Sequence, residues 1–151
     1  MMRSLVLTFI AAASLFIQPL CAQTKSAITP EDWYPALTPS IRASLELLKE
    51  ANSTAEMNSL SRQIADMTDA QVYIAYIRLY EGSNTKARAV LLAEQTKWLK
   101  ARAKAAKDGI ESEDGSLAPI EANNAEVTYS EKRLRELRDR LKKITSKDED
   151  E

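Results

Sequence analysis

Apolar residues recur at helical spacing along most of the chain, and the clearest stripe lies near its C-terminal end. Polar Asn123 and Ser130 interrupt the first half of this stripe, which favours packing within one domain over a free-standing coiled-coil dimer. We therefore predict an antiparallel packing helix from about Pro119 to Ile144. The stripe repeats every seven residues at Ile120, Val127, Leu134 and Leu141, with Leu137 and Ile144 on the adjoining line.

Turn-forming residues divide the rest of the chain into long segments. No proline occurs between Pro39 and Pro119, and the only glycines are Gly82, Gly109 and Gly115. This spacing is typical of long helices joined by short turns. It predicts an all-α fold, an antiparallel bundle of three long helices plus a short N-terminal helix.

Capping residues predict where these helices begin and end. Thr38 followed by Pro39 favours a short helix running to about Glu50, preceded by an irregular leader over residues 23–37. The run Ser53-Thr54-Ala55-Glu56 has capping-box spacing and predicts a helix to Tyr80 or Glu81. A third helix should restart at residues 83–85 and end near Gly109.

The first 22 residues have the pattern of an export signal. Arg3 precedes a short apolar run from Leu5 to Ile17, which is too short to span a bilayer stably. Leu20-Cys21-Ala22 then offers a cleavage site after Ala22, and lipid attachment at Cys21 is the alternative. We expect a periplasmic or secreted protein made of a leader with the short helix (23–52), a helical domain (53–145) and an acidic disordered tail (146–151).

Composition argues against catalysis. The chain has no histidine, and Cys21, its only cysteine, would leave with the signal, so a histidine base, a thiol nucleophile and disulfides are all excluded. No glycine-rich phosphate loop occurs, and we predict no catalytic residue, no metal site and no cofactor. The formal net charge of −1 gives no bulk attraction to nucleic acid or anionic lipid.

One face of the third predicted helix combines an arginine with a large aromatic residue. Leu91, Gln95, Trp98, Arg102 and Ala105 share this face because they are three or four residues apart. The Arg102 guanidinium should lie on the indole of Trp98 or reach a carboxylate on a neighbouring helix, with Asp69 as the first candidate. A structural pair and a functional pair are both compatible with this pattern.

Two further patterns have both a binding and a packing interpretation. Lys97, Lys100, Lys104 and Lys107 form a basic ridge, with Arg88 further back, that either docks an anionic envelope polymer or is a solvated helix face. Tyr73, Tyr76 and Tyr80 form a stripe that is either half-buried packing or a binding platform.

The longest polar connection between helices runs from Ile110 to Ala118 and is rich in acidic residues. Loops on rigid scaffolds are favoured places for recognition, although a solvated connector has the same composition. The candidate contact residues are Glu111, Glu113, Asp114 and Ser116.

Short motifs follow one another in a fixed order between residues 53 and 141. They are Thr54-Ala55-Glu56-Met57-Asn58, Asp69, Tyr76, Gln95-Thr96-Lys97-Trp98 with Arg102, Gly115-Ser116-Leu117-Ala118-Pro119, and Ser130 with Arg133 and Leu137. This order resembles the LprI-like lysozyme-inhibitor domain of exported bacterial proteins. That family has an E-M-N start, a Q-x-x-W-x-x-x-R run, a G-S-x-x-P turn and a closing T-x-x-R-x-x-x-L pattern.

The resemblance also shows where this chain departs from the family. Positions usually held by family cysteines are occupied by Leu60, Ala106 and Ala125. Apolar replacements keep an interior filled while losing the crosslink, which contributes about 2–5 kcal/mol in a small domain. If the match is right, Leu60 and either Ala125 or Ala106 should lie near one another in the core.

The resemblance implies an inhibitor that binds lysozyme or another cell-wall hydrolase. An acidic loop on a rigid helical scaffold could be steered to such basic targets. The alternative is a non-enzymatic envelope structural or stress protein that binds anionic cell-surface polymer through the lysine ridge. In the inhibitor reading Glu111, Glu113, Asp114 and Ser116 make contact, and the scaffold consists of Asp69, Tyr76, Gln95, Trp98, Arg102 and Arg133.

Overall fold

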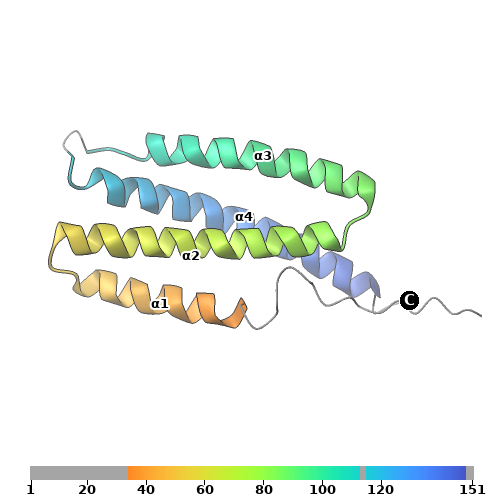
Figure 1. Cartoon of the computed structure of the whole chain (residues 1–151), viewed down its shortest axis with the longest axis horizontal. Coiled ribbons are helices and arrows are strands. Elements are labelled where there is room, and N and C mark those ends of the chain that lie inside the picture. Colours follow the sequence, from red (N-terminus) through yellow and green to blue (C-terminus); the bar gives the residue numbers. More distant parts are fainter. Residues whose placement is uncertain (1–33, 113–114, 149–151) are drawn as a thin grey trace, which may run out of the picture.

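Every regular element in the described part of the chain is a helix. The structure, a computed structural model, describes residues 34–112 and 115–148. The predicted export signal and most of the leader, Glu113, Asp114 and the end of the acidic tail lie outside these residues. The four helices are α1 (Tyr34–Glu50), α2 (Thr54–Glu81), α3 (Thr85–Asp108) and α4 (Ala118–Asp148), which confirms the predicted all-α bundle (Figure 1).

Local capping explains the boundaries of α2 and α3. The Ser53 hydroxyl accepts a hydrogen bond from the Glu56 amide at 3.2 Å, and the Glu56 carboxylate accepts one from the Asn52 amide at 3.2 Å. These contacts satisfy amides that have no partner within the helix. Gly82 ends α2, and the Asn84 side chain caps α3 by accepting from the Ala87 amide at 3.0 Å. The end of α2 and the start of α3 both lie where the sequence predicted them.

The predicted start of α1 is wrong. The helix begins at Tyr34, and Pro39 lies inside it. Pro39 removes the backbone bond to the carbonyl of Pro35 and its ring crowds that carbonyl, which is why the sequence favoured a start at Pro39; Pro35 itself occupies the first turn. The Thr38 hydroxyl does not cap the helix because it accepts a hydrogen bond from Gln71 of α2 at 2.8 Å.

The last helix is longer than predicted. It begins at Ala118, which leaves Pro119 in the first turn, and it continues past Ile144 to Asp148. The prediction of a disordered tail is therefore wrong for residues 146–148. No glycine or proline follows Pro119, so the sequence contains no residue that would end the helix earlier.

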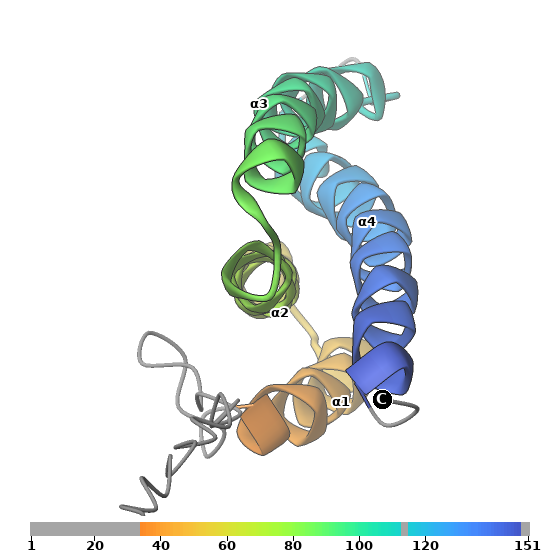
Figure 2. The same cartoon turned by 90° about the vertical axis from the view of Figure 1, so that its right-hand side faces the viewer.

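Neighbours along the chain are antiparallel, yet the most extensive contact joins two helices that run in the same direction. α4 packs along α2, and the partners Ser61–Asn123 and Asp69–Ser130 stay 62 and 61 residues apart, as a parallel pair requires. α3 packs antiparallel on α4, and α1 packs on α2, whereas α2 and α3 make little direct contact. Seen end-on, α1 and α3 lie on opposite sides of the α2–α4 pair (Figure 2).

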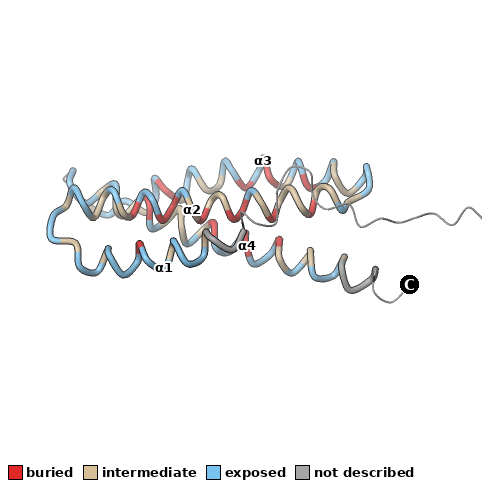
Figure 3. Tube along the Cα trace, turned by 60° about the horizontal axis from the view of Figure 1, so that its bottom comes forward, coloured by how far each residue is buried: buried red, intermediate tan, exposed pale blue. Residues whose placement is uncertain are grey.

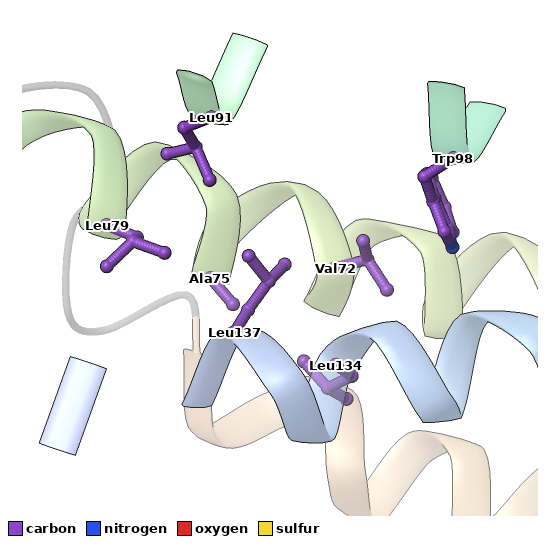
Figure 4. Close-up of a cluster of buried hydrophobic side chains, with 7 residues drawn as sticks. All are labelled: Val72, Ala75, Leu79, Leu91, Trp98, Leu134 and Leu137. Carbon is purple, nitrogen blue, oxygen red and sulfur yellow. The ribbon is translucent and has the colours of Figure 1, made fainter. Parts of the chain in front are cut away.

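The core lies where α2, α3 and α4 converge. Burial follows the inward sides of these helices, whereas α1 is mostly exposed (Figure 3). In the predicted stripe of α4, Leu134 and Leu137 are buried, and Leu141 and Ile144 pack against them. The stripe's polar interruptions, Asn123 and Ser130, are also buried. The cluster comprises Val72, Ala75, Leu79, Leu91, Trp98, Leu134 and Leu137 (Figure 4).

Candidate functional site

A polar network anchored on Arg102 connects the three core helices. The guanidinium of Arg102 in α3 pairs with Asp69 of α2 and with Glu126 of α4, the latter at 3.1 Å, and it donates to the Ser130 hydroxyl at 3.3 Å. It also lies over the Trp98 ring, 5.8 Å from the centroid. The predicted Asp69 partner and the predicted indole contact are both confirmed. One arginine thus fixes the register of three helices.

The network extends along the α2–α4 seam through a second arginine. Arg62 pairs with Asp66 and shares the Glu126 carboxylate at 3.1 Å. Asn123 accepts from Arg62 at 3.3 Å and donates to the buried Ser61 hydroxyl at 3.0 Å. The polar residues that interrupt the α4 stripe therefore have partners, which is the condition for placing them in an interior.

Asp69 remains electrostatically strained despite its partners. Burial raises the pKa of its carboxyl above the ordinary value of 3.8, and this outweighs the opposing effects of the Ser130 hydroxyl and Arg102. The nearby Glu126 charge raises the pKa further. Ser130 donates to the second Asp69 oxygen at 2.8 Å. Desolvation therefore dominates here over ion pairing.

The remaining predicted scaffold residues form a second cluster around Arg133. Its buried guanidinium reaches Gln95 at 3.4 Å, Glu136 at 3.4 Å and Glu94 at 3.7 Å, which are long contacts for an ion. Tyr76 lies close enough for the Arg133 charge to act on its pKa, although burial dominates and raises that pKa. Within the described residues, Gln95 Nε2 and Trp98 Nε1 are buried without a hydrogen-bond partner.

The predicted contact loop is fastened to the N-terminus of α4. One carboxylate oxygen of Glu121 accepts from the Glu111 amide at 2.9 Å, the Ser112 amide at 3.0 Å and the Ser112 hydroxyl at 2.8 Å. The backbone amide and hydroxyl of Ser112, followed by the Glu111 amide, lower the pKa of Glu121 below its ordinary value of 4.5. Sequence reasoning missed Glu121, because a glutamate in a first helical turn has an ordinary dipole role as well.

The far side of the loop is attached to α2. The Ser116 carbonyl accepts a hydrogen bond from Asn58 at 3.4 Å, and Gly115 adopts a positive φ of 39°, which favours glycine. Glu111 and Ser116 are exposed at the end of the bundle where α2 and α4 begin (Figure 1). The structure thus places two of the four predicted contact residues.

The positions matched to family cysteines differ in burial. Ala106 is buried, whereas Leu60 and Ala125 are only partly buried, so the prediction of a core position is wrong for Leu60 and Ala125. A Cβ added to Gly109 would lie 2.5 Å from the Ala125 Cβ, so the end of α3 and the start of α4 approach closely. The expected proximity of Leu60 to either alanine stays a prediction.

The basic ridge is smaller than predicted. Its four lysines are exposed, but Lys104 pairs with Asp108. Arg88 is not part of the ridge because it turns inward and donates to the Tyr80 and Glu81 carbonyls, each at 2.9 Å. Carbonyls at a helix C-terminus attract cations, and this explains the turn.

The tyrosine stripe serves packing at two of its three positions. Tyr76 and Tyr80 are partly buried against the core, with ring centroids 6.0 Å apart. Tyr73 is exposed to 45%. In the described residues no group of acids, cysteines or histidines is arranged to hold a metal ion, and no helix there is long and apolar enough to cross a membrane.

A groove between α3 and α4 was not predicted. It has a volume of about 290 Å³. Four residues from each helix line it, and they have the same spacing in both helices. That spacing of three, one and three residues occurs in each helix, but only the antiparallel pairing of α3 with α4 makes the two sets face one another. The lining comprises Glu94, Lys97, Trp98 and Ala101 from α3, and Tyr129, Lys132, Arg133 and Glu136 from α4.

Sequence comparison adds one finding to this geometry. The family described as "Lysozyme inhibitor LprI" matches residues 48–137, more than half of the chain. The matched stretch begins near the end of α1 and includes all of α2 and α3, the loop and the first two thirds of α4. No curated protein and no solved structure shows a significant match to the chain.

Proposed function

Because this chain belongs to the LprI family of lysozyme inhibitors, we propose that it binds and inhibits a lysozyme or a related cell-wall hydrolase. The match over residues 48–137 carries this proposal, since it takes in the core network and the loop together. The protein would act by steric and electrostatic complementarity and would have no chemical step of its own. Export after cleavage near Ala22, to the compartment where such hydrolases act, is part of the proposal.

We assign target contact to the loop that carries Glu111, Glu113, Asp114 and Ser116. The exposure of Glu111 and Ser116 supports this assignment, and the anchors at Glu121 and Asn58 hold both sides of the loop on rigid helices. A preorganised loop loses less conformational entropy on binding than an unanchored one. Its acidic side chains would be attracted to a basic hydrolase and would speed the encounter.

The loop assignment is tested by changing Glu111, Glu113 and Asp114 together to serine. Binding to the target lysozyme should then be lost, whereas a matched triple change of exposed Glu50, Glu131 and Asp139 to serine, outside the loop, should leave it intact. Both variants remove three negative charges, so the pair separates a local contact from a general charge effect. Unchanged affinity in the loop variant would refute the assignment.

The basic ridge supports a second function, binding of an anionic envelope polymer. Lys97, Lys100 and Lys107 are exposed and have no ion pair among the described residues. Neutralising the lysines of the ridge should then weaken polymer binding, and added salt should weaken it in the wild type. Salt-independent binding would argue against this function.

A further inference from the structure

The groove between α3 and α4 combines aromatic walls with charges of both signs. Trp98 of α3 and Tyr129 of α4 meet between the two helices, with their rings stacked at 6.4 Å between centroids and 25° between planes. Tyr129 is only partly buried, and Ala101 beside it is small. Such a surface offers a flat apolar patch for the C–H face of a sugar ring, while its volume suits one ring.

The buried cation of the groove, Arg133, makes only long contacts with its acceptors. The side chain of Arg133 is only 8% exposed, and its contacts with three partner residues are all 3.4 Å or longer. The Glu94 carboxylate, one of these contacts, is held more closely by Arg140 at 2.6 Å. A buried guanidinium with such long contacts gains from an additional anion, because charge-assisted hydrogen bonds are normally shorter.

Two exposed lysines add positive charge at the two rims of the groove. Lys97 lies on the α3 rim and Lys132 on the α4 rim, and neither has an ion pair in the part of the chain that the structure describes. Together with Arg133 they surround a single small volume. A carboxylate in that volume would interact with all three cations.

The acidic residues of the groove restrict what can enter. Glu94 and Glu136 line it as well, so a polyanion or an acidic peptide would meet repulsion. A ligand with hydroxyl groups and a single anionic group avoids this problem, because carboxylates accept hydrogen bonds from hydroxyls while the cations take the anion. The mixture of signs therefore selects for a polyhydroxyl ring with one charge.

We propose that the groove binds one acidic sugar residue, a pyranose ring that carries a carboxylate. The ring lies against Tyr129 and the edge of Trp98, and the carboxylate meets Arg133 between Lys97 and Lys132. This site is separate from the loop assigned to hydrolase contact. The proposal therefore does not depend on the inhibitor function. It would place the protein on a glycan that contains such a sugar.

The proposal is tested with two sugars that differ only in the acidic group. N-acetylmuramic acid carries a lactyl carboxylate on the ring of N-acetylglucosamine, and each is titrated into the purified, isotope-labelled protein while amide NMR shifts are followed. The acidic sugar should bind about tenfold more tightly, the factor expected for one added charge-assisted contact. Equal affinity for the two sugars, or no shift near Tyr129 at about 10 mM ligand, would overturn the proposal.

Matched variants separate the groove from general charge. The double variant K97Q/K132Q should bind the acidic sugar about fivefold or more weakly than the wild type. The control double variant K100Q/K107Q should bind it as the wild type does. All four lysines are exposed, so both variants should fold. Tyr129→Leu, checked for folding by circular dichroism, should lower affinity for both sugars. An equal loss in the two lysine pairs would show diffuse charge attraction and refute the site.

Discussion

Arg102 on α3 forms an ion pair with Asp69 on α2, although these two helices make little direct contact with each other. The arginine reaches across the gap between them and also pairs with Glu126 of α4. The side chains of all three residues are at most 17% exposed. The position of α3 relative to the α2–α4 pair therefore depends on this polar contact as well as on apolar packing.

Removal of the Arg102 charge should destabilise the bundle strongly. Arg102→Met leaves Asp69 and Glu126 largely buried with less compensation, and we expect a loss of about 3 kcal/mol in the free energy of unfolding. Urea unfolding measures this loss. Lys104→Gln breaks an exposed pair on the same helix and should cost less than about 0.5 kcal/mol. Equal effects of the two changes would show that the network is not structural.

Asp69 should make stability depend on pH in a defined direction. Burial raises its pKa in the folded state above 3.8, so the folded state holds this proton more tightly than the unfolded state does. Its contribution to stability is therefore largest below pH 3.8 and decreases as the pH rises through the raised pKa. The unfolding free energy of the wild type minus that of Asp69→Asn should therefore fall as the pH rises over that range. A difference that rises with pH would contradict the burial argument.

Glu121 should produce the opposite dependence in the loop. Its pKa is lowered from 4.5, so its hydrogen bonds to Glu111 and Ser112 are fully present above that pH and are lost as the pH falls through the lowered value. Hydrogen exchange of the Glu111 and Ser112 amides reports these bonds directly. Glu121→Ala should remove their protection at neutral pH and leave α2 protected. Persistent protection in this variant would exclude the anchor.

Gly109 is required by the close approach of α3 to α4. A Cβ at this position would lie 2.5 Å from the Ala125 Cβ, and Gly109→Ala should destabilise the protein by about 1–3 kcal/mol. Ala125→Gly in the same chain should restore part of that loss. Gly82→Ala is the matched control, since its nearest neighbour would be 3.6 Å away. Thermal unfolding of the four proteins measures both effects, and a harmless Gly109→Ala would disprove the steric argument.

The helices were predictable because their signals are local. Ser53, Asn84 and Gly82 mark the helix ends through bonds to residues within one turn. Pro39 misled the prediction because a proline normally occupies the first turn of a helix, whereas here it lies in the second turn. The Arg102–Asp69 pair was predictable as well, since a cation on a buried face requires a carboxylate and few acids lie on α2.

The groove could not be predicted in the same way. Its two halves, around Trp98 and Tyr129, are separated along the chain and face one another only because α3 and α4 pack antiparallel. The parallel α2–α4 contact was equally hidden, because a heptad stripe shows which face packs but not which helix covers it. Glu121 became visible only when the loop amides were located.

The proposed inhibitor function is tested most directly by measuring the hydrolysis of a bacterial cell-wall suspension by several lysozyme classes, with increasing amounts of the purified protein. The inhibitor function predicts that the activity of at least one class falls and that the effect saturates near one protein per enzyme. Full activity of every class in excess protein would contradict it. In that case the LprI match would reflect a shared fold, and binding to envelope polymer would become the leading function.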